Sequence, residues 1–294
     1  MAQFYLTLPS NSSYFGKQPM NNYKTKLATT LNINREDWEV GLSEIIYPYT
    51  WNNLQTNATI TIFVSNLHKD PKQYKLKQKT LTLRISYYKD VSSLVDKVNR
   101  RFDRALKKMK DKTILDTPYW RLKFEYNPNS GKVYLKGNNH ICVKLSGNLA
   151  SMFGFGSQDA VLGSAKLCPR FKTGYMKMFK DPDEDDDEDD EEELRKILKG
   201  DVMADVHEGL TCLYVYSSIV ESQLVGDMKA PLLRVIPVNG QFGHTQTVRY
   251  DNIYYLPLSQ NWIDTVEVYI RDDIGRLVSF NTGRVTIVLH FRKK

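Results

Sequence analysis

Apolar and polar residues alternate with a period of two along much of the chain. Residues 38–43 and 59–64 show this alternation in the first part of the sequence, and residues 265–271 and 285–292 show it near the end. Such patterns are typical of half-buried strands in antiparallel sheets. From 209 to 291 the pattern predicts about six strands and almost no helix.

Turn residues separate these segments at the expected places. Asp272-Asp273-Ile274-Gly275 and Asn281-Thr282-Gly283 lie among the last strands, and Asn127-Pro128-Asn129-Ser130-Gly131 separates 121–126 from 132–136. Glycine, asparagine and aspartate tolerate the positive φ angles that tight turns between strands require. The sequence therefore predicts a fold dominated by β-structure.

One amphipathic helix is predicted over residues 91–110, with Asp90 placed to cap its first turn. The opposite face of this helix is basic, which indicates either a solvated surface or a binding surface. A shorter helix is predicted over 147–153. The apolar face comprises Val91, Leu94, Val95, Val98, Phe102, Leu106 and Met109, and the basic face Lys97, Arg100, Arg101, Arg104, Lys107, Lys108 and Lys110.

Length and composition set the broad class. A chain of 294 residues forms one large or two modest domains, and 41% hydrophobic residues provide a substantial core. Three cysteines (Cys142, Cys168 and Cys212) do not form the framework of a small disulfide-rich protein. There is no signal-like N-terminus and no apolar run of about 18 residues. We therefore expect a soluble protein without a membrane span, in a reducing compartment.

Charge is distributed unevenly. The formal net charge is +7, but twelve of the thirteen residues in 181–193 are acidic. Without those twelve, 22 acidic residues stand against 41 basic ones, and the remaining chain has a net charge of +19. A cationic body favours a polyanionic partner, although solubility alone is the alternative explanation. The candidate polyanion-facing residues are Arg100, Arg101, Arg104, Lys107, Lys108, Arg292, Lys293 and Lys294.

The acidic segment 181–193 is predicted to be a disordered surface loop, because its charges repel one another. One hypothesis is an exposed insertion that only increases solubility. The other is a counter-charge that masks the basic surface until assembly, or a hook for a basic partner. Its candidate residues are Asp183, Asp185, Asp186, Asp187, Asp189, Asp190, Glu191, Glu192 and Glu193.

No established catalytic or cofactor motif is found. The five histidines are scattered, the cysteine spacing suits no metal centre, and Gly154-Phe155-Gly156 lacks the rest of a phosphate-binding loop. Paired carboxylates at Asp264, Glu267 and Asp272-Asp273 are the strongest enzymatic candidates, but strand and turn roles explain them. No zinc finger or helix-turn-helix is present, so nucleic acid would be bound through phosphates without sequence preference. We predict no enzymatic activity, no cofactor and no metal site.

Three stretches resemble a known family. The sequence is similar to the minor capsid, or penton, proteins of Polinton/Maverick elements and adintoviruses, from about Phe4 to Arg292 and most strongly after Gly209. The stretches that carry the resemblance are 38–48 with Trp51, 213–227 with 231–234, and 255–258 followed by 264–275 and 288–292.

The resemblance implies a single jelly-roll β-sandwich that forms homopentamers at the five-fold vertices of an icosahedral virion. Its implied partners are further copies of itself and the major capsid protein of the same element, with assembly in the host nucleus. The cationic surface adds the hypothesis that it faces packaged DNA, through non-specific phosphate contacts, or an acidic neighbour in the shell. We expect residues 1–64 and 206–294 to form the jelly roll, with the strand at 59–64 completing its eight strands. Residues 65–205 would then be an inserted α+β lobe that holds the helix, a small sheet and the acidic loop.

A cellular β-sandwich that binds carbohydrate or protein is the alternative. Carbohydrate binding favours exposed aromatic side chains near loops, and Tyr47, Tyr49 and Trp51 form the one candidate cluster. Oligomeric state distinguishes the two hypotheses, since a recognition module does not need a closed ring.

Overall fold

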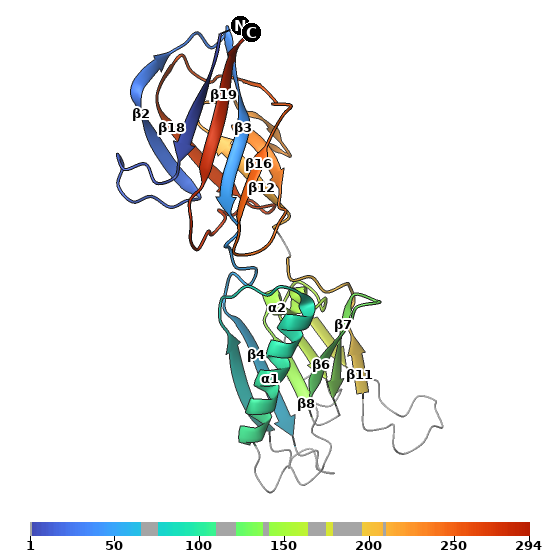
Figure 1. The fold of residues 1–294 in the computed structure, drawn as a ribbon. Coiled ribbons are helices and arrows are strands. Elements are labelled where there is room, and N and C mark those ends of the chain that lie inside the picture. The colour runs from blue at the N-terminus through green and yellow to red at the C-terminus, as the bar shows by residue number, and fades with distance from the viewer. Residues whose placement is uncertain are drawn as a thin grey trace. The chain divides into compact units, whose positions relative to one another are not determined.

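The computed structural model describes residues 2–65, 76–109, 122–137, 141–163, 175–178, 196–207 and 210–294. The chain divides into two compact units (Figure 1). The first unit, which we call the sandwich unit, comprises Met1–Asn52 and Gly209–Lys294. The second, the inserted unit, comprises Asn53–Glu208.

Two antiparallel sheets form the sandwich unit. The first has the strand order β1-β19-β3-β16 and the second the order β15-β12-β18-β2. The short strand β17 (Leu256–Pro257) also pairs with β3, beyond the end of β16. The bounds are β1 (Gln3–Pro9), β2 (Asn22–Asn32), β3 (Trp38–Pro48), β12 (Cys212–Ser217), β15 (Leu232–Pro237), β16 (Thr245–Arg249), β18 (Trp262–Arg271) and β19 (Thr286–Lys293).

The order of these eight strands is that of a jelly roll. Along the chain, β1, β3, β16 and β19 enter the first sheet, whereas β2, β12, β15 and β18 enter the second. This arrangement of two interlocked Greek keys is the jelly-roll topology. The prediction of an all-β dominated, single jelly-roll fold is confirmed, and the inserted unit lies in the chain between the third and fourth of its strands.

One strand assignment in the sequence analysis is wrong. The segment 59–64 lies within β4 (Ala58–Ser65), which pairs with strands of the inserted unit, and the units divide after Asn52. The jelly roll instead takes β1, β2 and β3 from the N-terminal part of the chain. Strand β2 escaped prediction because it lies at a sheet edge and buries only Tyr23 and Thr25, which makes a weak apolar pattern.

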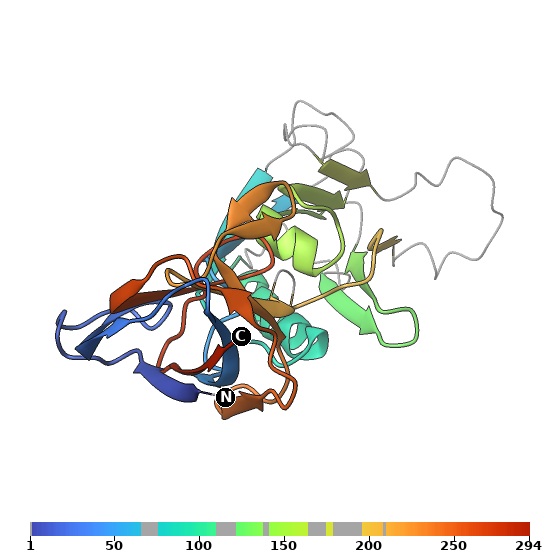
Figure 2. The same ribbon diagram turned by 90° about the horizontal axis from the view of Figure 1, so that it is seen from above.

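The alternating residues of the last strands meet in the core of the sandwich, as their period predicts. Val266, Val268 and Ile270 of β18 are buried, as are Leu289 and Phe291 of β19. The two sheets are also joined by a hydrogen bond, in which the Tyr23 hydroxyl of β2 donates to the Leu8 carbonyl of β1 at 3.1 Å. In both Figure 1 and Figure 2 the N- and C-termini lie side by side, because β1 pairs with β19.

The inserted unit contains two further sheets and two helices. One sheet has the order β10-β9-β8-β4-β5, with β9 and β10 parallel, and the other has the order β11-β7-β6. No helix of the described residues is long and apolar enough to span a bilayer. The bounds are β5 (Leu76–Leu83), α1 (Val91–Met109), β6 (Lys123–Asn127), β7 (Lys132–Gly137), β8 (Ile141–Leu145), α2 (Gly147–Met152), β9 (Ala160–Gly163), β10 (Tyr175–Met178) and β11 (Lys196–Lys199).

Helix α1 begins and packs as its sequence predicts. The Ser93 amide donates to the Asp90 carboxylate at 2.7 Å, and the Asp90 amide donates to the Ser93 hydroxyl at 3.3 Å, which makes a reciprocal cap. The apolar face packs on β5 and β6. The Asn99 amide group both donates to and accepts from the backbone of Phe124, at 2.8 and 2.9 Å, and so fixes the helix to β6.

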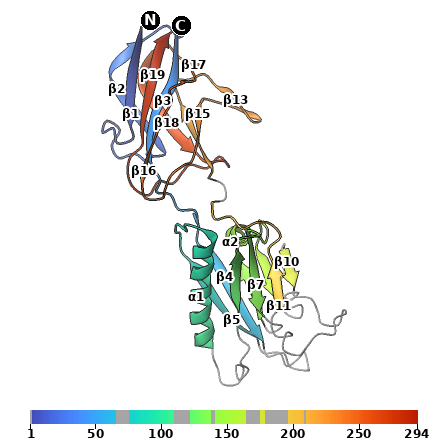
Figure 3. The ribbon, with the colours of Figure 1, turned by 45° about the vertical axis from the view of Figure 1, so that its right-hand side comes forward.

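A two-stranded ribbon connects β12 to β15 in the sandwich unit. Strands β13 (Gln223–Val225) and β14 (Met228–Ala230) pair only with each other, around a turn in which Gly226 has a φ of 62°. In Figure 3, β13 projects away from the two sheets, on the side opposite β1 and β2.

Candidate functional site

The candidate polyanion-facing residues of the helix belong to α1 in the inserted unit, whereas Lys110 lies outside the described residues. Arg100, Arg104, Lys107 and Lys108 are exposed. Arg101 is half-buried, and its guanidinium donates to the carbonyl oxygen of Thr82 at 2.7 Å. Arg101 therefore helps to fix the helix to β5, and the other four residues present the positive charge of this face.

The other predicted basic residues, Arg292, Lys293 and Lys294, belong to the sandwich unit. The Arg292 guanidinium lies 3.6 Å from the Tyr255 ring and donates to the Glu39 carboxylate at 2.5 Å. The Lys294 ammonium donates to the Glu36 carbonyl at 3.1 Å. Arg292 is thus held in a local ion pair, so it contributes little net charge to a polyanion-binding surface. The acidic segment 181–193 lies outside the described residues.

A second lysine-rich surface was missed by the sequence analysis. The outer face of the sheet β11-β7-β6, which we call the lysine face, carries Lys123, Lys132, Lys136 and Lys199 around Tyr134. Glu125 forms ion pairs with Lys136 at 2.7 Å and with Lys123 at 3.2 Å. The hydrogen bond with Ser130 lowers the pKa of the half-buried Tyr134 hydroxyl, and the nearby charges of Lys199 and Lys132 lower it further. The alternation of Lys132, Tyr134 and Lys136 is the sequence signal for this face.

An aromatic cluster surrounds His290 on the outer face of the first sheet, the polar side on which the period-two pattern places this residue. The Tyr255 hydroxyl lies 2.6 Å from His290 Nδ1, and the Tyr5 ring centroid lies 4.5 Å from the imidazole centroid. His290 is buried, and no group of the described residues lies within hydrogen-bonding distance of its Nε2. Burial, with a further contribution from the charge of Arg292, lowers the pKa of His290 below 6.5.

This environment predicts loss of stability in mild acid. Because the folded state binds the His290 proton more weakly than the unfolded state does, the free energy of unfolding falls as pH drops from 6.5 through the folded-state pKa. Denaturant unfolding at about pH 7.5 and about pH 5 measures this effect. The variant His290→Gln, which keeps every other titrating group, is expected to lose less stability between the two pH values. An equal loss in both proteins would contradict the assignment.

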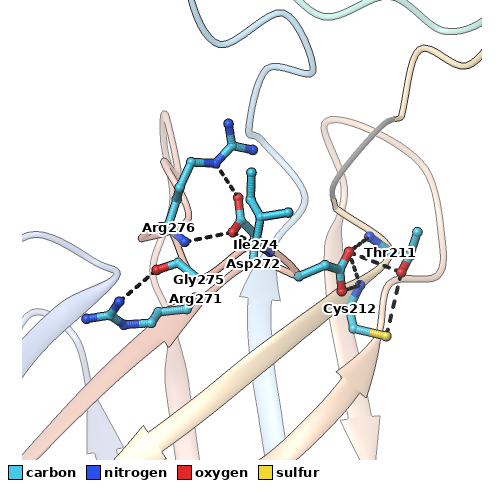
Figure 4. Close-up of polar contacts among 8 residues, drawn as sticks. Thr211, Cys212, Arg271, Asp272, Ile274, Gly275 and Arg276 are labelled. Atoms are coloured by element: carbon cyan, nitrogen blue, oxygen red, sulfur yellow. Dashed lines mark hydrogen bonds and ion pairs between the residues drawn. The ribbon is translucent and has the colours of Figure 1, made fainter. Parts of the chain in front are cut away.

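The four carboxylates considered for catalysis have structural partners. The buried Asp272 carboxylate accepts from the amides of Ile274 and Arg276 at 3.1 and 2.8 Å and from the Arg276 guanidinium at 2.8 Å (Figure 4). Asp273 accepts from the amide of Cys212 at 3.1 Å. Asp264 pairs with Lys26 at 2.5 Å, and Glu267 pairs with Lys24 at 3.2 Å. Asp272 and Asp273 therefore shape the turn after β18 and tie it to the start of β12.

The described residues offer neither a metal site nor a sugar-binding platform. No group of three or more His, Cys, Asp or Glu side chains there is placed to hold a metal ion. The aromatic cluster of the carbohydrate-binding alternative is buried, with the Tyr49 and Trp51 rings stacked at 4.3 Å and Tyr47 at 6.2 Å from Trp51. These three rings contribute to the core and do not present an exposed platform to a sugar.

Large apolar side chains are exposed on one edge of the sandwich unit. Leu224 is 79% exposed and Met228 61% exposed on the β13–β14 ribbon, and Tyr254 is 59% exposed near the base of the ribbon. A groove of about 360 Å³ lies beside Tyr254, lined by Gln223, residues 232–235 and Tyr254 itself. We call Leu224, Met228, Tyr254 and this groove the hairpin surface. Exposed apolar patches of this kind on soluble proteins commonly mark interaction sites.

The sequence matches no protein family model and no curated protein. Among solved structures, the selenomethionine-labelled mavirus penton protein is similar over 100% of both chains, with a TM-score of 0.46 and 11% sequence identity.

Proposed function

We propose that this protein is a structural capsid protein of the penton type, which forms homopentamers at the five-fold vertices of an icosahedral shell. The observation that carries the proposal is a complete eight-stranded jelly roll with the exposed apolar side chains Leu224, Met228 and Tyr254 at one of its edges. The similarity of its sequence motifs to penton proteins of Polinton/Maverick elements and adintoviruses agrees with this role. Its partners would be further copies of itself and the major capsid protein of the same element.

Closure of a ring places a physical demand on the surface. Five identical subunits around one axis must use two different patches, one on each side, because a self-complementary patch yields only a dimer. Such contacts are centred on aromatic and large apolar side chains with a polar rim. The hairpin surface has this composition, since Tyr254, Leu224 and Met228 lie among polar neighbours.

Light scattering coupled to size-exclusion chromatography tests the oligomeric state. We expect a species of five times the chain mass of 34.1 kDa, and class averages with five-fold symmetry in negative-stain images. The experiment is run with a reducing agent, so that disulfides between cysteines of different copies cannot create oligomers. A chain that remains monomeric at every concentration would contradict the proposal and favour a monomeric binding module.

We also propose that the exposed side of α1 binds a polyanion, with packaged DNA as the first candidate. The support is the positive charge of Arg100, Arg104, Lys107 and Lys108, whose side chains project to solvent. Lysine and arginine bind phosphates without sequence preference, and each contact releases counterions from DNA.

Charge reversal at Arg100, Arg104 and Lys107 tests this contact. If all three residues bind phosphates, the slope of log affinity against log salt should become shallower by about 0.9 for each lost contact. The matched control reverses three exposed cations of the sandwich unit that are not among the candidate polyanion-facing residues, Lys17, Arg35 and Arg284. Equal slopes for the wild-type protein and the α1 variant would exclude DNA as the partner of this face. In that case, binding of the α1 face to the major capsid protein would be tested next, with the same charge-reversed variant.

A further inference from the structure

The basic residues of α1 are not spread evenly over its exposed side. Lys97, Arg101, Arg104 and Lys108 follow one another at intervals of four, three and four residues. Residues three and four apart are neighbours on the surface of a helix, so these four side chains form one nearly straight row. At about 1.5 Å per residue, the row is about 17 Å long. We call these four residues the basic row.

Two contacts of α1 show on which side of the helix the basic row lies. The Arg101 guanidinium donates to the Thr82 carbonyl of β5 at 2.7 Å, so the row follows the side of the helix that is next to β5. On the other side, the Asn99 amide group holds the backbone of Phe124 in β6. The other three residues of the row are exposed, and none of them forms an ion pair with a described residue.

The part of the exposed surface nearer to β6 carries both signs of charge. Asp96 precedes Arg100 by four residues and Asp103 precedes Lys107 by four, so each of these cations has a carboxylate as a neighbour on the helix. The Arg100 guanidinium also donates to the backbone carbonyl of Asp96 at 3.3 Å. A phosphate that approached here would be repelled by both carboxylates. We call Asp96, Arg100, Asp103 and Lys107 the mixed side of α1.

Strand β5 adds one cation beside the basic row. Side chains of a strand alternate between its two faces, so Lys79 shares the face of Leu81, which packs against the core that contains the apolar face of α1. Lys79 is exposed. The chain turns back between β5 and α1, so that the helix returns along the strand (Figure 1). Counted from the contact of Thr82 with Arg101, Lys79 and Lys108 each lie about 10 Å further in the same direction.

We propose that the basic row and Lys79 bind the phosphate backbone of a double-stranded nucleic acid that lies along α1. The inference rests on the proposed polyanion contact of α1, and it names the side of the helix and the form of the nucleic acid. One strand of a DNA duplex carries one negative charge for about every 3.4 Å of its length, so the row faces about five phosphates. A duplex is stiff over about 150 base pairs, and a straight row of cations can follow it without bending it.

The aromatic content of α1 and β5 favours a duplex over a single strand. Proteins that bind single strands without sequence preference stack the bases on exposed aromatic side chains. The only aromatic residue in these two elements is Phe102, which is fully buried. The bases of a single strand would therefore have no ring of α1 or β5 to stack on, whereas the phosphates of a duplex require only cations.

Two double variants of the full chain test the position of the contact. Lys97→Glu/Lys108→Glu reverses two cations of the basic row, and Arg100→Glu/Lys107→Glu is the matched control on the mixed side. Both variants change the net charge equally, and each removes one of the two cations of the last helical turn, so α1 should be equally stable in both. Circular dichroism checks that both remain folded.

Binding of a short DNA duplex is then measured at several salt concentrations. The basic-row variant should reduce the slope of log affinity against log salt by about 1.8, because two phosphate contacts are lost, and the control should leave the slope nearly unchanged. Lys79→Gln should reduce the slope by about 0.9, whereas Lys229→Gln, at an exposed position of the sandwich unit, should not. One strand of the same duplex, presented alone, should bind the wild-type protein more weakly than the duplex does.

The outcomes separate this inference from the proposed function on which it rests. Equal reductions of the slope in both double variants would overturn the basic row and leave the polyanion contact of α1 intact. Equal or tighter binding of the single strand would overturn the duplex as the ligand, and an unchanged slope in Lys79→Gln would exclude β5. Wild-type slopes in both double variants and in the triple variant at Arg100, Arg104 and Lys107 would instead overturn the proposed DNA contact itself.

Discussion

Replacing Phe124 with alanine should lower the free energy of unfolding of the inserted unit by about 3–5 kcal/mol. Phe124 is fully buried, and its ring centroid lies 5.6 Å from that of Phe102 and 4.8 Å from that of Phe153. It is also the β6 residue whose backbone is held by Asn99 of α1. Its removal leaves a cavity where the helix, the three-stranded sheet and α2 meet, and the surrounding rings cannot fill it completely.

Denaturant unfolding followed by hydrogen exchange measures both the size and the place of this effect. Protection should fall in α1, β6 and β7, and it should change little in β12 and β18, which belong to the other core. The matched control is Phe15→Ala, because Phe15 is exposed in the sandwich unit and should cost less than about 0.5 kcal/mol. A loss below about 1 kcal/mol at Phe124, or equal loss of protection in both units, would show that the cores are not separate in this way.

Replacing Gly41 with valine should destabilise the sandwich unit by about 1–3 kcal/mol and weaken the proposed ring. A side chain at this position would collide with the side chain of Ile253 and with the carbonyl oxygen of Tyr254. The segment that contains Ile253 and Tyr254 would then be lifted from β3, and Tyr254 would leave the groove beside β15. The hydrogen bond between Tyr255 and His290 would be strained for the same reason.

Two measurements separate these consequences. Denaturant unfolding gives the loss of stability, and sedimentation at a temperature where the variant remains folded gives the loss of assembly. Thr247→Val on the exposed side of β16 is the control, since it places valine on an exposed strand position without a collision, keeps the β-branching and should change neither quantity. A Gly41→Val protein that is as stable as the wild type, or one that is less stable but assembles equally well, would exclude Tyr254 from the contact.

The sequence could predict those helices and strands whose periodic pattern of apolar residues is complete within one segment of the chain. Over Val266–Ile270 of β18 and Ile287–Phe291 of β19 every second residue is apolar, and α1 has both its cap and its apolar face in one stretch, so each element is visible without knowledge of its neighbours. Strand β2 is different, because its edge position demands only Tyr23 and Thr25 in the core. The segment 59–64 shows a clear strand period, but a period does not specify the sheet to which a strand belongs.

The candidate surfaces were harder to predict because they combine residues that are distant in the sequence. Tyr134 and Lys199 meet only because β11 pairs with β7, and the groove of the hairpin surface brings Gln223 and β15 together with Tyr254. A count of charges also treats every basic residue alike. In the structure, however, Arg101 donates a hydrogen bond to the Thr82 carbonyl and Arg292 donates one to the Glu39 carboxylate. The exposed cations Arg100, Arg104, Lys107 and Lys108 are distinguished from these two only by the tertiary structure.

The pairing of β1 with β19 also constrains the order of events during synthesis. Gln3 lies opposite Arg292, so the first sheet of the sandwich cannot close until residues 286–293 have left the ribosome. The inserted unit, in contrast, is one continuous stretch from Asn53 to Glu208. All of its strands have therefore been synthesised before the last strands of the sandwich. Contacts between distant residues form slowly, whereas contiguous units fold during translation. A nascent chain would therefore carry a folded inserted unit before its sandwich exists, and subunits could not join one another prematurely on the ribosome.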